Sequence, residues 1–389
     1  MDVMPERKSR IAPHVAELPK SGIRKFFDIV AQSKDIVSLG VGEPDFDTPW
    51  HISRAAVTCL ENGGTHYTSN LGTPALRQAI VRYLNRRFAA GFDWQKEVLV
   101  TVGVSEAIDL AIRAICSPGD EVLYHEPCFV SYAPTIRLAH AVPVCVETRV
   151  EDEFRLTVEA MERKVTPRTK AILLNFPCNP TGATLSREEM EVILRFAAKH
   201  DLIVLADEVY SELNYDSRLT SFASFPEHHG RVILLNGFSK SWAMTGYRLG
   251  YACGPADIID AMMKIHQYGI MSAPTLSQAA GVEAMDRGDK DVDRMRREYR
   301  KRRDFLVPAL NDLGLKTLMP KGAFYIFSDI RSTGLSDEAF ALKLLKEFGV
   351  AVVPGSAFGA CGAGFVRMSY ATSLDKIKLA AERIGKMLK

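Results

Sequence analysis

Lys240 and Arg248 form a pair whose residue types and spacing suggest chemistry. They stand eight residues apart in the segment Phe-Ser-Lys-Ser-Trp-Ala-Met-Thr-Gly-Tyr-Arg-Leu-Gly at 238–250, directly after the apolar run 231–235. A lysine amine in a small, dry turn can form an imine with an aldehyde, and a guanidinium can bind a phosphate dianion through two parallel hydrogen bonds. Because pyridoxal phosphate requires both groups at one place, this pair predicts that cofactor.

Polar residues also follow three other apolar runs of the sequence. These segments are Gly103-Val104-Ser105, Asn179-Pro180-Thr181-Gly182 and Asp207-Glu208-Val209-Tyr210. In an open parallel sheet, ligands bind beyond the carboxyl ends of the strands. We therefore expect these segments and Ser239-Lys240 to meet in one crevice, although they lie far apart along the chain.

Asp207, Asn179 and Tyr210 could each contact a pyridine ring. Asp207 follows an apolar run, and a carboxylate at the end of a buried strand needs a cationic partner, which a protonated pyridine nitrogen can supply. Asn179 and Tyr210 offer hydrogen-bond donors for a ring phenolate oxygen, which would lower the pKa of the imine nitrogen. Taken singly, Asp207 is also explained by a helix N-cap or a buried salt bridge, Asn179 by a turn, and Tyr210 by core packing.

Two further positions could bind anions. The turn at Val104 and Ser105 precedes a helical pattern of apolar residues. Its free backbone amides form a candidate phosphate site, to which Ser239 and Arg248 would add donors. A helix N-cap explains Ser105 equally well. Arg367 lies in a strand-like run, where a substrate α-carboxylate and an internal salt bridge would satisfy a buried arginine equally well.

The sequence around these segments predicts an α/β fold. Short β-branched apolar runs alternate with helical patterns, which is typical of a mostly parallel mixed sheet with flanking helices. Thr73-Pro74, and Ser186 with Glu189, have the spacing of helix starts. The apolar runs lie at 98–102, 121–124, 142–146, 171–175, 202–206 and 232–235.

The composition changes after about residue 285. A long basic helix is expected around 294–303, with a solvated face because acidic residues interleave with the basic ones. The elements expected beyond it are strands at 323–327, 350–353 and 365–370 and helices at 337–348 and 375–388. We therefore divide the chain into an N-terminal arm with part of the small domain (1–45), a large cofactor-binding domain (46–285) and a small C-terminal α+β domain (286–389).

The bulk composition is that of an ordinary globular enzyme. The formal net charge is +2 and 47% of residues are hydrophobic, so nothing favours a nucleic-acid or membrane partner over small molecules. The seven cysteines are odd in number and lack a paired metal spacing, so we expect neither a disulfide framework nor a metal site. With no signal peptide or apolar stretch of about 18 residues, the sequence predicts a cytoplasmic protein.

In order and spacing, these residues resemble the class I aminotransferases of the fold-type I pyridoxal phosphate enzymes. The resemblance covers nearly the whole chain, and it is strongest to aromatic aminotransferases of archaeal type in Pro-Cys-Phe-Val-Ser-Tyr-Ala-Pro at 127–134 and Asp-Glu-Phe-Arg-Leu at 152–156. The other matching segments are 38–46 (Ser-Leu-Gly-Val-Gly-Glu-Pro-Asp-Phe), His66-Tyr67, the Asn-Pro-Thr-Gly turn, the lysine segment, 322–327 (Gly-Ala-Phe-Tyr-Ile-Phe) and 353–356 (Val-Pro-Gly-Ser).

The resemblance implies a role for each site residue. Lys240 would carry the cofactor, Asp207 would pair with the pyridine nitrogen, and Asn179 and Tyr210 would bind the ring oxygen. Phe129 would stack on the ring. Those that would hold the phosphate are Val104, Ser105, Ser239 and Arg248, with Tyr67 from the partner subunit. Those that would contact the substrate are Gly42, Asn179 and Arg367. The site would therefore be complete only in a homodimer.

The resemblance also implies a reaction. Lys240, with Asp207 and Tyr210 as the other catalytic residues, would move a proton between the substrate α-carbon and the cofactor, and 2-oxoglutarate would accept the amino group in a ping-pong mechanism. Gly237 stands where the best-known aspartate enzymes have a phosphate-binding serine, which places one phosphate contact in doubt. Glycine there is familiar in a related subgroup.

Several alternatives remain open at the level of sequence. The absence of an identifiable second arginine, and of a lysine near Ser105, favours aromatic or mixed donors over aspartate. The segment Ser21-Gly-Ile-Arg-Lys-Phe-Phe also resembles N-acetyl-diaminopimelate aminotransferases. A C–S β-lyase would share the cofactor. A cofactor-sensing DNA-binding regulator on this fold would need a longer segment than the residues before Ser38.

Overall fold

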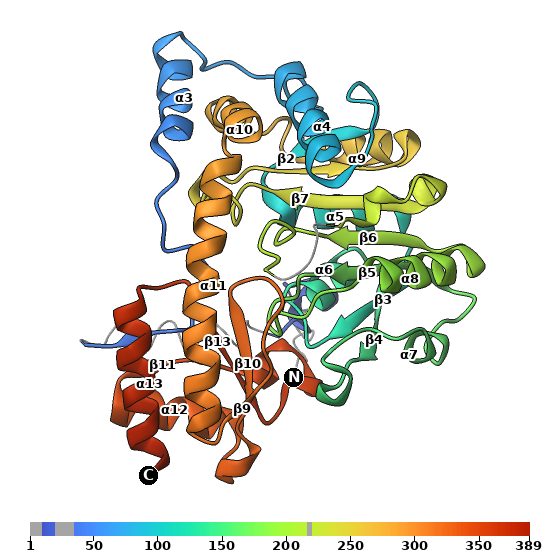
Figure 1. Cartoon of the computed structure of the whole chain (residues 1–389). Helices are drawn as coiled ribbons and strands as arrows, with labels where there is room; N and C mark the ends of the chain where they lie inside the picture. The colour runs from blue at the N-terminus through green and yellow to red at the C-terminus, as the bar shows by residue number, and fades with distance from the viewer. Residues whose placement is uncertain (1–9, 20–34, 216–219) are drawn as a thin grey trace, which may run out of the picture.

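A seven-stranded mixed sheet forms the centre of the larger part of the molecule (Figure 1). The computed structural model describes residues 10–19, 35–215 and 220–389. The strands, in spatial order, are β2 (Val98–Thr101), β8 (Gly250–Cys253), β7 (Val232–Gly237), β6 (Ile203–Asp207), β5 (Thr169–Asn175), β3 (Glu121–Glu126) and β4 (Val142–Glu147). β8 is antiparallel to both neighbours, and the pairs from β7 to β4 are parallel. The predicted mostly parallel mixed sheet is confirmed.

β8 is the one strand of this large sheet that the sequence did not predict. It follows the lysine segment directly and inserts between β2 and β7. All four of its residues are buried. Because the strand is short and begins with glycine, its own pattern of residues is weak. Its two partner strands, which are distant in sequence, define it.

Helices cover both faces of this sheet. They are α3 (Trp50–Glu61), α4 (Pro74–Phe88), α5 (Gly103–Ile115), α6 (Tyr132–Leu138), α7 (Val158–Glu162), α8 (Arg187–Lys199), α9 (Ala256–Gly269) and α10 (Thr275–Arg287). Leu205 of β6 packs with side chains of α5, α6 and α9, whereas its neighbours Val204 and Ala206 pack with those of α7 and α8. This alternation is expected because successive side chains of a strand point to opposite faces.

Two helix starts agree with the sequence. The Thr73 hydroxyl accepts a hydrogen bond from Leu76 N at the start of α4, where Pro74 is the first helical residue. At the start of α8, Ser186 and Glu189 form both hydrogen bonds of a capping box, at 3.2 and 2.7 Å. These side chains satisfy backbone amides that have no partner inside the helix.

A second, four-stranded sheet lies with the C-terminal helices (Figure 1). Its strands, in spatial order, are β12 (Val353–Pro354), β13 (Phe365–Ser369), β10 (Tyr325–Asp329) and β9 (Lys316–Thr317), all antiparallel. The remaining elements are α1 (Pro13–Ala16), β1 (Val37–Ser38), α11 (Asp289–Asp312), α12 (Asp337–Phe348), β11 (Val350–Ala351) and α13 (Leu374–Leu388). β1 pairs in parallel with β11, so the segment before the large sheet packs into the C-terminal core. The chosen domain limits stay a prediction.

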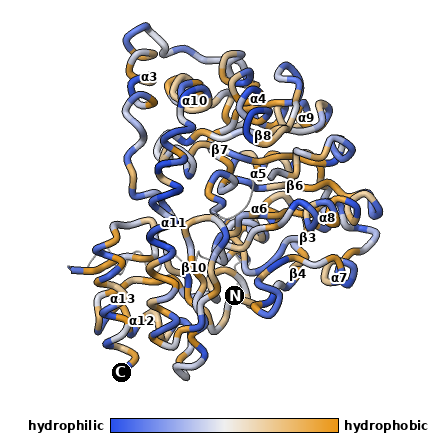
Figure 2. Tube along the Cα trace, in the orientation of Figure 1, coloured by the Kyte–Doolittle hydropathy of each residue, from blue (hydrophilic) through white to orange (hydrophobic). Residues whose placement is uncertain are grey.

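Part of the basic face of α11, which we expected to be solvated, is buried. Figure 2 shows it as one of the most hydrophilic helices, yet Arg302 and Arg303 on it are buried. Arg302 binds the Asp45 carboxylate at 2.7 Å, and Arg303 donates to the Pro320 carbonyl oxygen at 2.9 Å. The expectation was wrong for these two arginines because their side chains are buried in the fold and each guanidinium finds an acceptor there.

The start of β10 also differs from the expected strand at 323–327. The strand begins at Tyr325 because Ala323 has a φ of 56°, which is outside the extended region. No helix among the residues that the structure describes is long and apolar enough to cross a membrane.

Candidate active site

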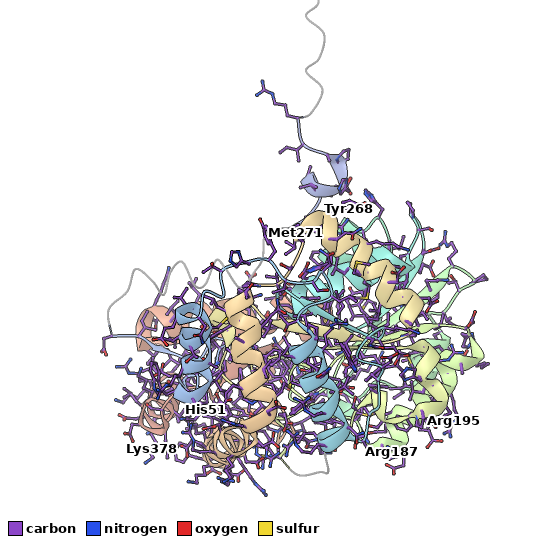
Figure 3. The ribbon with its side chains drawn as sticks, turned by 90° about the horizontal axis from the view of Figure 1, so that it is seen from above. His51, Arg187, Arg195, Tyr268, Met271 and Lys378 are labelled. Atoms are coloured by element: carbon purple, nitrogen blue, oxygen red, sulfur yellow. The ribbon has the colours of Figure 1, made fainter. Side chains whose placement is uncertain are left out.

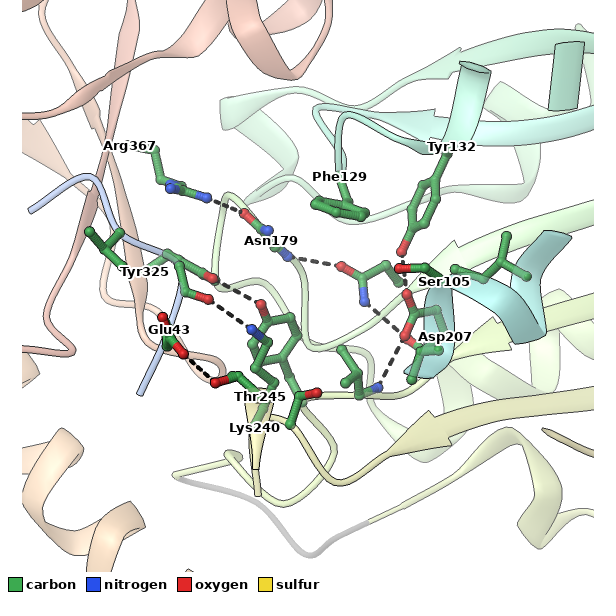
Figure 4. Close-up of a pocket in the computed structure, with 18 of the residues that line it drawn as sticks. Glu43, Ser105, Phe129, Tyr132, Asn179, Asp207, Lys240, Thr245, Tyr325 and Arg367 are labelled. Atoms are coloured by element: carbon green, nitrogen blue, oxygen red, sulfur yellow. Dashed lines mark hydrogen bonds between the residues drawn. The ribbon is translucent and has the colours of Figure 1, made fainter. Parts of the chain in front are cut away.

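The carboxyl ends of the large sheet open into a cavity of about 430 Å³ (Figure 4). The first turn of α5, the segment after β1, and residues of β10 and β13 complete its wall. The predicted site residues that line it are Gly42, Val104, Ser105, Phe129, Asn179, Asp207, Tyr210, Ser239, Lys240, Arg248 and Arg367. The strand-exit segments therefore meet in one crevice, as expected from sequence.

Lys240 follows the end of β7 and extends into this cavity. Its Nζ donates a hydrogen bond to the Gly42 carbonyl oxygen at 2.8 Å. Burial lowers the pKa of Lys240 to about 8, although the nearby carboxylate of Glu43 opposes the shift. The amine therefore loses its proton at a lower pH than an exposed lysine, as an imine-forming nucleophile requires.

Asp207 is the last residue of β6 and is buried beneath the cavity. Its Oδ2 accepts a hydrogen bond from the Tyr132 hydroxyl at 2.7 Å, and its Oδ1 accepts one from Val209 N at 3.2 Å. Burial raises the pKa of Asp207 to about 6, and these two hydrogen bonds oppose the shift. Among the described residues no cationic side chain forms an ion pair with it, so a cationic ligand atom would complete the site.

Arg367 lies across the cavity from Asp207 (Figure 4). Its Nη1 donates to Asn179 Oδ1 at 3.0 Å and its Nη2 donates to the Gly40 carbonyl oxygen at 2.5 Å. The guanidinium is buried, its Nε has no hydrogen-bond partner, and no carboxylate in the described part of the chain forms an ion pair with it. The internal salt bridge that was the alternative explanation for Arg367 is therefore not present in the described part of the chain. A ligand carboxylate could accept a hydrogen bond from the unpaired Nε.

Tyr210 is held by a residue to which the sequence analysis gave no role. Its hydroxyl forms a hydrogen bond of 2.9 Å with the Tyr325 hydroxyl, and the two rings meet edge to face. Arg367 stacks over the Tyr325 ring at 4.5 Å. Tyr325 lies in the segment Gly-Ala-Phe-Tyr-Ile-Phe that carried the family resemblance, which was the available signal. Its contact with Tyr210 depends on the tertiary fold.

Tyr132 and Asn175 were also missed. Tyr132 belongs to the quoted segment at 127–134, and its ring packs edge to face against Phe129. Asn175 ends β5, where its Nδ2 donates to the Asp207 carbonyl oxygen at 3.0 Å and its Oδ1 accepts from Asn179 N at 3.0 Å. These contacts fix the positions of predicted residues.

Arg248 lies beside the first turn of α5. A Cβ on Gly103 would lie 2.7 Å from Arg248 Nη2, so glycine at this position, with a φ of 74°, lets the guanidinium approach the helix N-terminus. The free backbone amides there carry partial positive charge. Ser105, in the same turn, and Ser239 also line the cavity. An anion beside the helix N-terminus would meet its amides and the Arg248 guanidinium.

Close packing explains why position 237 is a glycine. Gly237 pairs with Gly250 across β7 and β8. A Cβ on Gly237 would lie 2.9 Å from Val104 Cγ2 and 3.0 Å from the Leu249 carbonyl oxygen. A serine therefore cannot be accommodated here unless the first turn of α5 or the neighbouring backbone moves.

Tyr67 is the predicted site residue that lies outside this cavity. Its side chain is 82% exposed. The expected contact of Tyr67 with a partner subunit's phosphate stays a prediction.

Comparison with known proteins gives the family. The model of the family described as aminotransferase class I and II matches residues 34–384. The chain belongs to this family. It is 48% identical to the putative aminotransferase YugH of Bacillus subtilis over 98% of each chain, and 47% identical to the aspartate aminotransferase of Pyrococcus abyssi over 95% of this chain and 96% of that one. The structure of the aromatic aminotransferase from Pyrococcus horikoshii matches with a TM-score of 0.89 and 45% identity. The match covers 94% of the present chain and 98% of the Pyrococcus chain.

The aminotransferase uses pyridoxal phosphate, and the residues of the cavity fit this cofactor. When bound, pyridoxal phosphate withdraws electrons from the substrate α-carbon, so that a proton can leave it. Lys240 presents an amine of lowered pKa, and Asp207 is a buried carboxylate that lacks an ion-pair partner among the described residues. Arg248 and the free amides at the α5 N-terminus lie side by side and could hold the phosphate.

Proposed function

We propose that this aminotransferase moves the amino group of an aromatic or other uncharged L-amino acid to 2-oxoglutarate by a ping-pong mechanism. The observation that carries the proposal is the set of cations in the cavity wall. Among the described residues these are Lys240, Arg248 and Arg367. We assign one to cofactor attachment, one to the phosphate and one to the substrate α-carboxylate.

This assignment leaves no described cation for a second carboxylate on the donor. Glu43 adds a carboxyl group to the same wall, where it accepts a hydrogen bond from the Thr245 hydroxyl (Figure 4). Val41, Ile108 and Phe129 contribute apolar surface. Because an unpaired charge is costly to bury, these surroundings favour phenylalanine or tyrosine over aspartate as donor.

The roles that we propose for the remaining residues follow from their contacts. Asp207, oriented by Tyr132, would pair with the cationic ring nitrogen of the cofactor. Tyr210 and Asn179 would bind the ring oxygen, and Phe129 would lie against the ring. Asn179 also holds Arg367 through its side-chain oxygen. With the Gly42 backbone, Asn179 and Arg367 would therefore orient the substrate carboxylate.

Lys240 is the residue that we propose to move the proton. Its Nζ lies against the Gly42 carbonyl oxygen, on the side of the cavity that also holds Glu43. With a pKa of about 8 the amine has an appreciable neutral fraction near neutral pH, so it can accept a proton. Asp207 and Tyr210 would act as catalytic partners by stabilising the cofactor's charges.

A homodimer with shared active sites is part of this proposal. Tyr67 is exposed, and the segment around it is held beside the turn between α9 and α10, because Thr275 donates a hydrogen bond to the His66 carbonyl oxygen. Tyr268 at the end of α9 and Met271 just after it point outward (Figure 3), with 88% and 45% of their surfaces exposed. An exposed apolar group of this kind supports a subunit contact that would bring Tyr67 to the partner's phosphate site.

Aspartate is the second candidate donor, because the Pyrococcus abyssi relative carries that name. The test is a donor panel of phenylalanine, tyrosine, aspartate, alanine and N-acetyl-diaminopimelate with 2-oxoglutarate. We expect kcat/KM for phenylalanine or tyrosine to exceed that for aspartate by at least about tenfold, the equivalent of 1.4 kcal/mol. Preference for aspartate or N-acetyl-diaminopimelate would refute the proposed donor. Pyruvate and ammonia formed from cystathionine without any oxo acid would show β-elimination instead.

A further inference from the structure

Glu126, Cys145 and Cys361 come together outside the active-site cavity. A carboxylate oxygen of Glu126 and the two Sγ atoms all lie within 4.8 Å of one another, and each residue is partly exposed. Glu126 ends β3, Cys145 lies on β4 at the edge of the large sheet, and Cys361 lies in the one-turn helix η7 (Ala360–Gly362) between β12 and β13. Two strands of the large sheet and the connection between β12 and β13 therefore contribute to one cluster of ligand-type atoms.

The sheet register explains why the first two side chains meet. In the parallel pair of β3 and β4, Tyr124 lies opposite Cys145 and Glu126 lies opposite Glu147. Alternate residues of a strand share a face, so Tyr124, Glu126 and Cys145 project to the same side. The Tyr124 hydroxyl donates a hydrogen bond of 2.7 Å to Glu126 Oε1 and so orients the carboxylate.

A close backbone approach brings in the third residue. Gly359, with a φ of 117°, would place a Cβ 2.3 Å from Glu126 Oε2, so only glycine lets the chain pass this near to the carboxylate. Directly after it, Ala360 N donates a hydrogen bond of 3.0 Å to the same oxygen. Cys361 is thereby held over the edge of the sheet.

Two thiols and an oriented carboxylate form a ligand set suited to a thiophilic divalent cation. Zinc binds cysteine sulfur at about 2.3 Å in tetrahedral geometry, which places two such sulfurs about 3.8 Å apart. The upper limit of 4.8 Å between the ligand atoms is compatible with this spacing. Each oxygen of Glu126 accepts one hydrogen bond and has two lone pairs, so one lone pair stays free for a metal.

We propose that Glu126, Cys145 and Cys361 bind Zn²⁺, with a water molecule as the fourth ligand. Tyr124 acts as a positioning residue, because it holds the carboxylate in its binding orientation. The bound ion ties the edge of the large sheet to the loop that leads into β13, the strand that carries Arg367. From the sequence we expected no metal site, because the three ligands are far apart in the chain and have no regular spacing.

The test uses the reduced holoenzyme, with Co²⁺ as a spectroscopic probe and Zn²⁺ as its competitor. Cobalt bound to thiolates gives a charge-transfer absorption that surface histidines and carboxylates do not give. We expect this absorption to saturate at one equivalent of Co²⁺ and to disappear on addition of Zn²⁺. Cys145→Ser, Cys361→Ser and Glu126→Gln should each abolish it or weaken binding, whereas Cys59→Ser and Cys116→Ser should match the wild type.

Further variants and outcomes keep the proposal falsifiable. Tyr124→Phe should weaken Zn²⁺ binding by about 10- to 100-fold without removing the absorption, as for other residues that orient a metal ligand. Cofactor absorbance and transaminase turnover, retained in every variant, report that the chain is folded. The absence of the charge-transfer absorption, its persistence in Cys145→Ser, or a Cys145–Cys361 disulfide formed in place of metal binding would overturn the proposal.

Discussion

For the substitution Gly237→Ser, the family resemblance and the structure predict opposite effects on cofactor binding. Comparison with aspartate enzymes suggests that a serine at this position adds a phosphate contact and tightens cofactor binding. The structure predicts the opposite. A Cβ there would lie 2.9 Å from Val104 Cγ2, 3.0 Å from the Leu249 carbonyl oxygen and 3.2 Å from Gly250 Cα. Two of these contacts are with backbone, which cannot rotate away.

The size of the effect follows from overpacking. Added atoms in a well-packed region cost about 1–3 kcal/mol. If the strain is relieved by displacing the first turn of α5, affinity for pyridoxal phosphate falls by about 5- to 150-fold, since 1.4 kcal/mol corresponds to tenfold. If it remains in the fold, the apoenzyme Tm falls by roughly 1–4 °C, because the unfolding entropy of a chain of this length is large.

The assay measures both quantities. Cofactor affinity is obtained by absorbance titration of the apoenzyme, and Tm by calorimetry of the apoenzyme and holoenzyme. Gly237→Ala separates the effect of the Cβ from that of the hydroxyl, and it should weaken binding or stability in the same direction. Gly246→Ser is the matched control, because a Cβ at Gly246 would meet no atom within 4 Å. Tighter cofactor binding by Gly237→Ser, with an unchanged Tm, would refute the steric reasoning.

Three further predictions concern the active site. Lys240→Ala should remove the imine absorbance and essentially all turnover, and a borohydride-reducible adduct that persists in this variant would show that the lysine is misassigned. Arg367→Gln should lower kcat/KM by about 30- to 1000-fold, because a buried charged hydrogen bond is worth about 2–4 kcal/mol, with the loss mainly in KM; unchanged KM values would contradict its role in carboxylate binding. Tyr132→Phe removes a hydrogen bond that opposes the raised pKa of Asp207, so the Asp207 pKa should rise further and the carboxylate should be ionised only at higher pH. The acid limb of the cofactor-binding pH profile should then move upward by about 1–2 units, given 1.5–3 kcal/mol for a hydrogen bond to a charged group, and a profile that does not move would separate Tyr132 from Asp207.

Residues at the ends of parallel strands were the part of the site that the sequence could predict. Asp207, Asn179 and Lys240 each follow an apolar run, and parallel strands present their carboxyl ends at one edge. Their convergence in one cavity needed only the strand pattern and the topology rule. The same local logic predicted the starts of α4 and α8, because a helix cap depends on residues three positions apart.

Contacts between distant parts of the chain were decided by the tertiary structure alone. Tyr325 forms a hydrogen bond with Tyr210, and Arg302 forms an ion pair with Asp45. Neither contact could be predicted from a periodic pattern in the sequence. β8 exists as a strand because two partners enclose it.

The sequence by itself determined the family, the cofactor and the residues that could carry the chemistry, since these depend on residue type and local order. The fold decided which of those side chains have partners and which donors stay free. It left Arg367 Nε vacant, excluded a side chain at Gly237, and brought Cys145 to Cys361. The physical reason is that pairing, steric exclusion and ligand geometry depend on distances in space, which the spacing of residues along a chain does not fix.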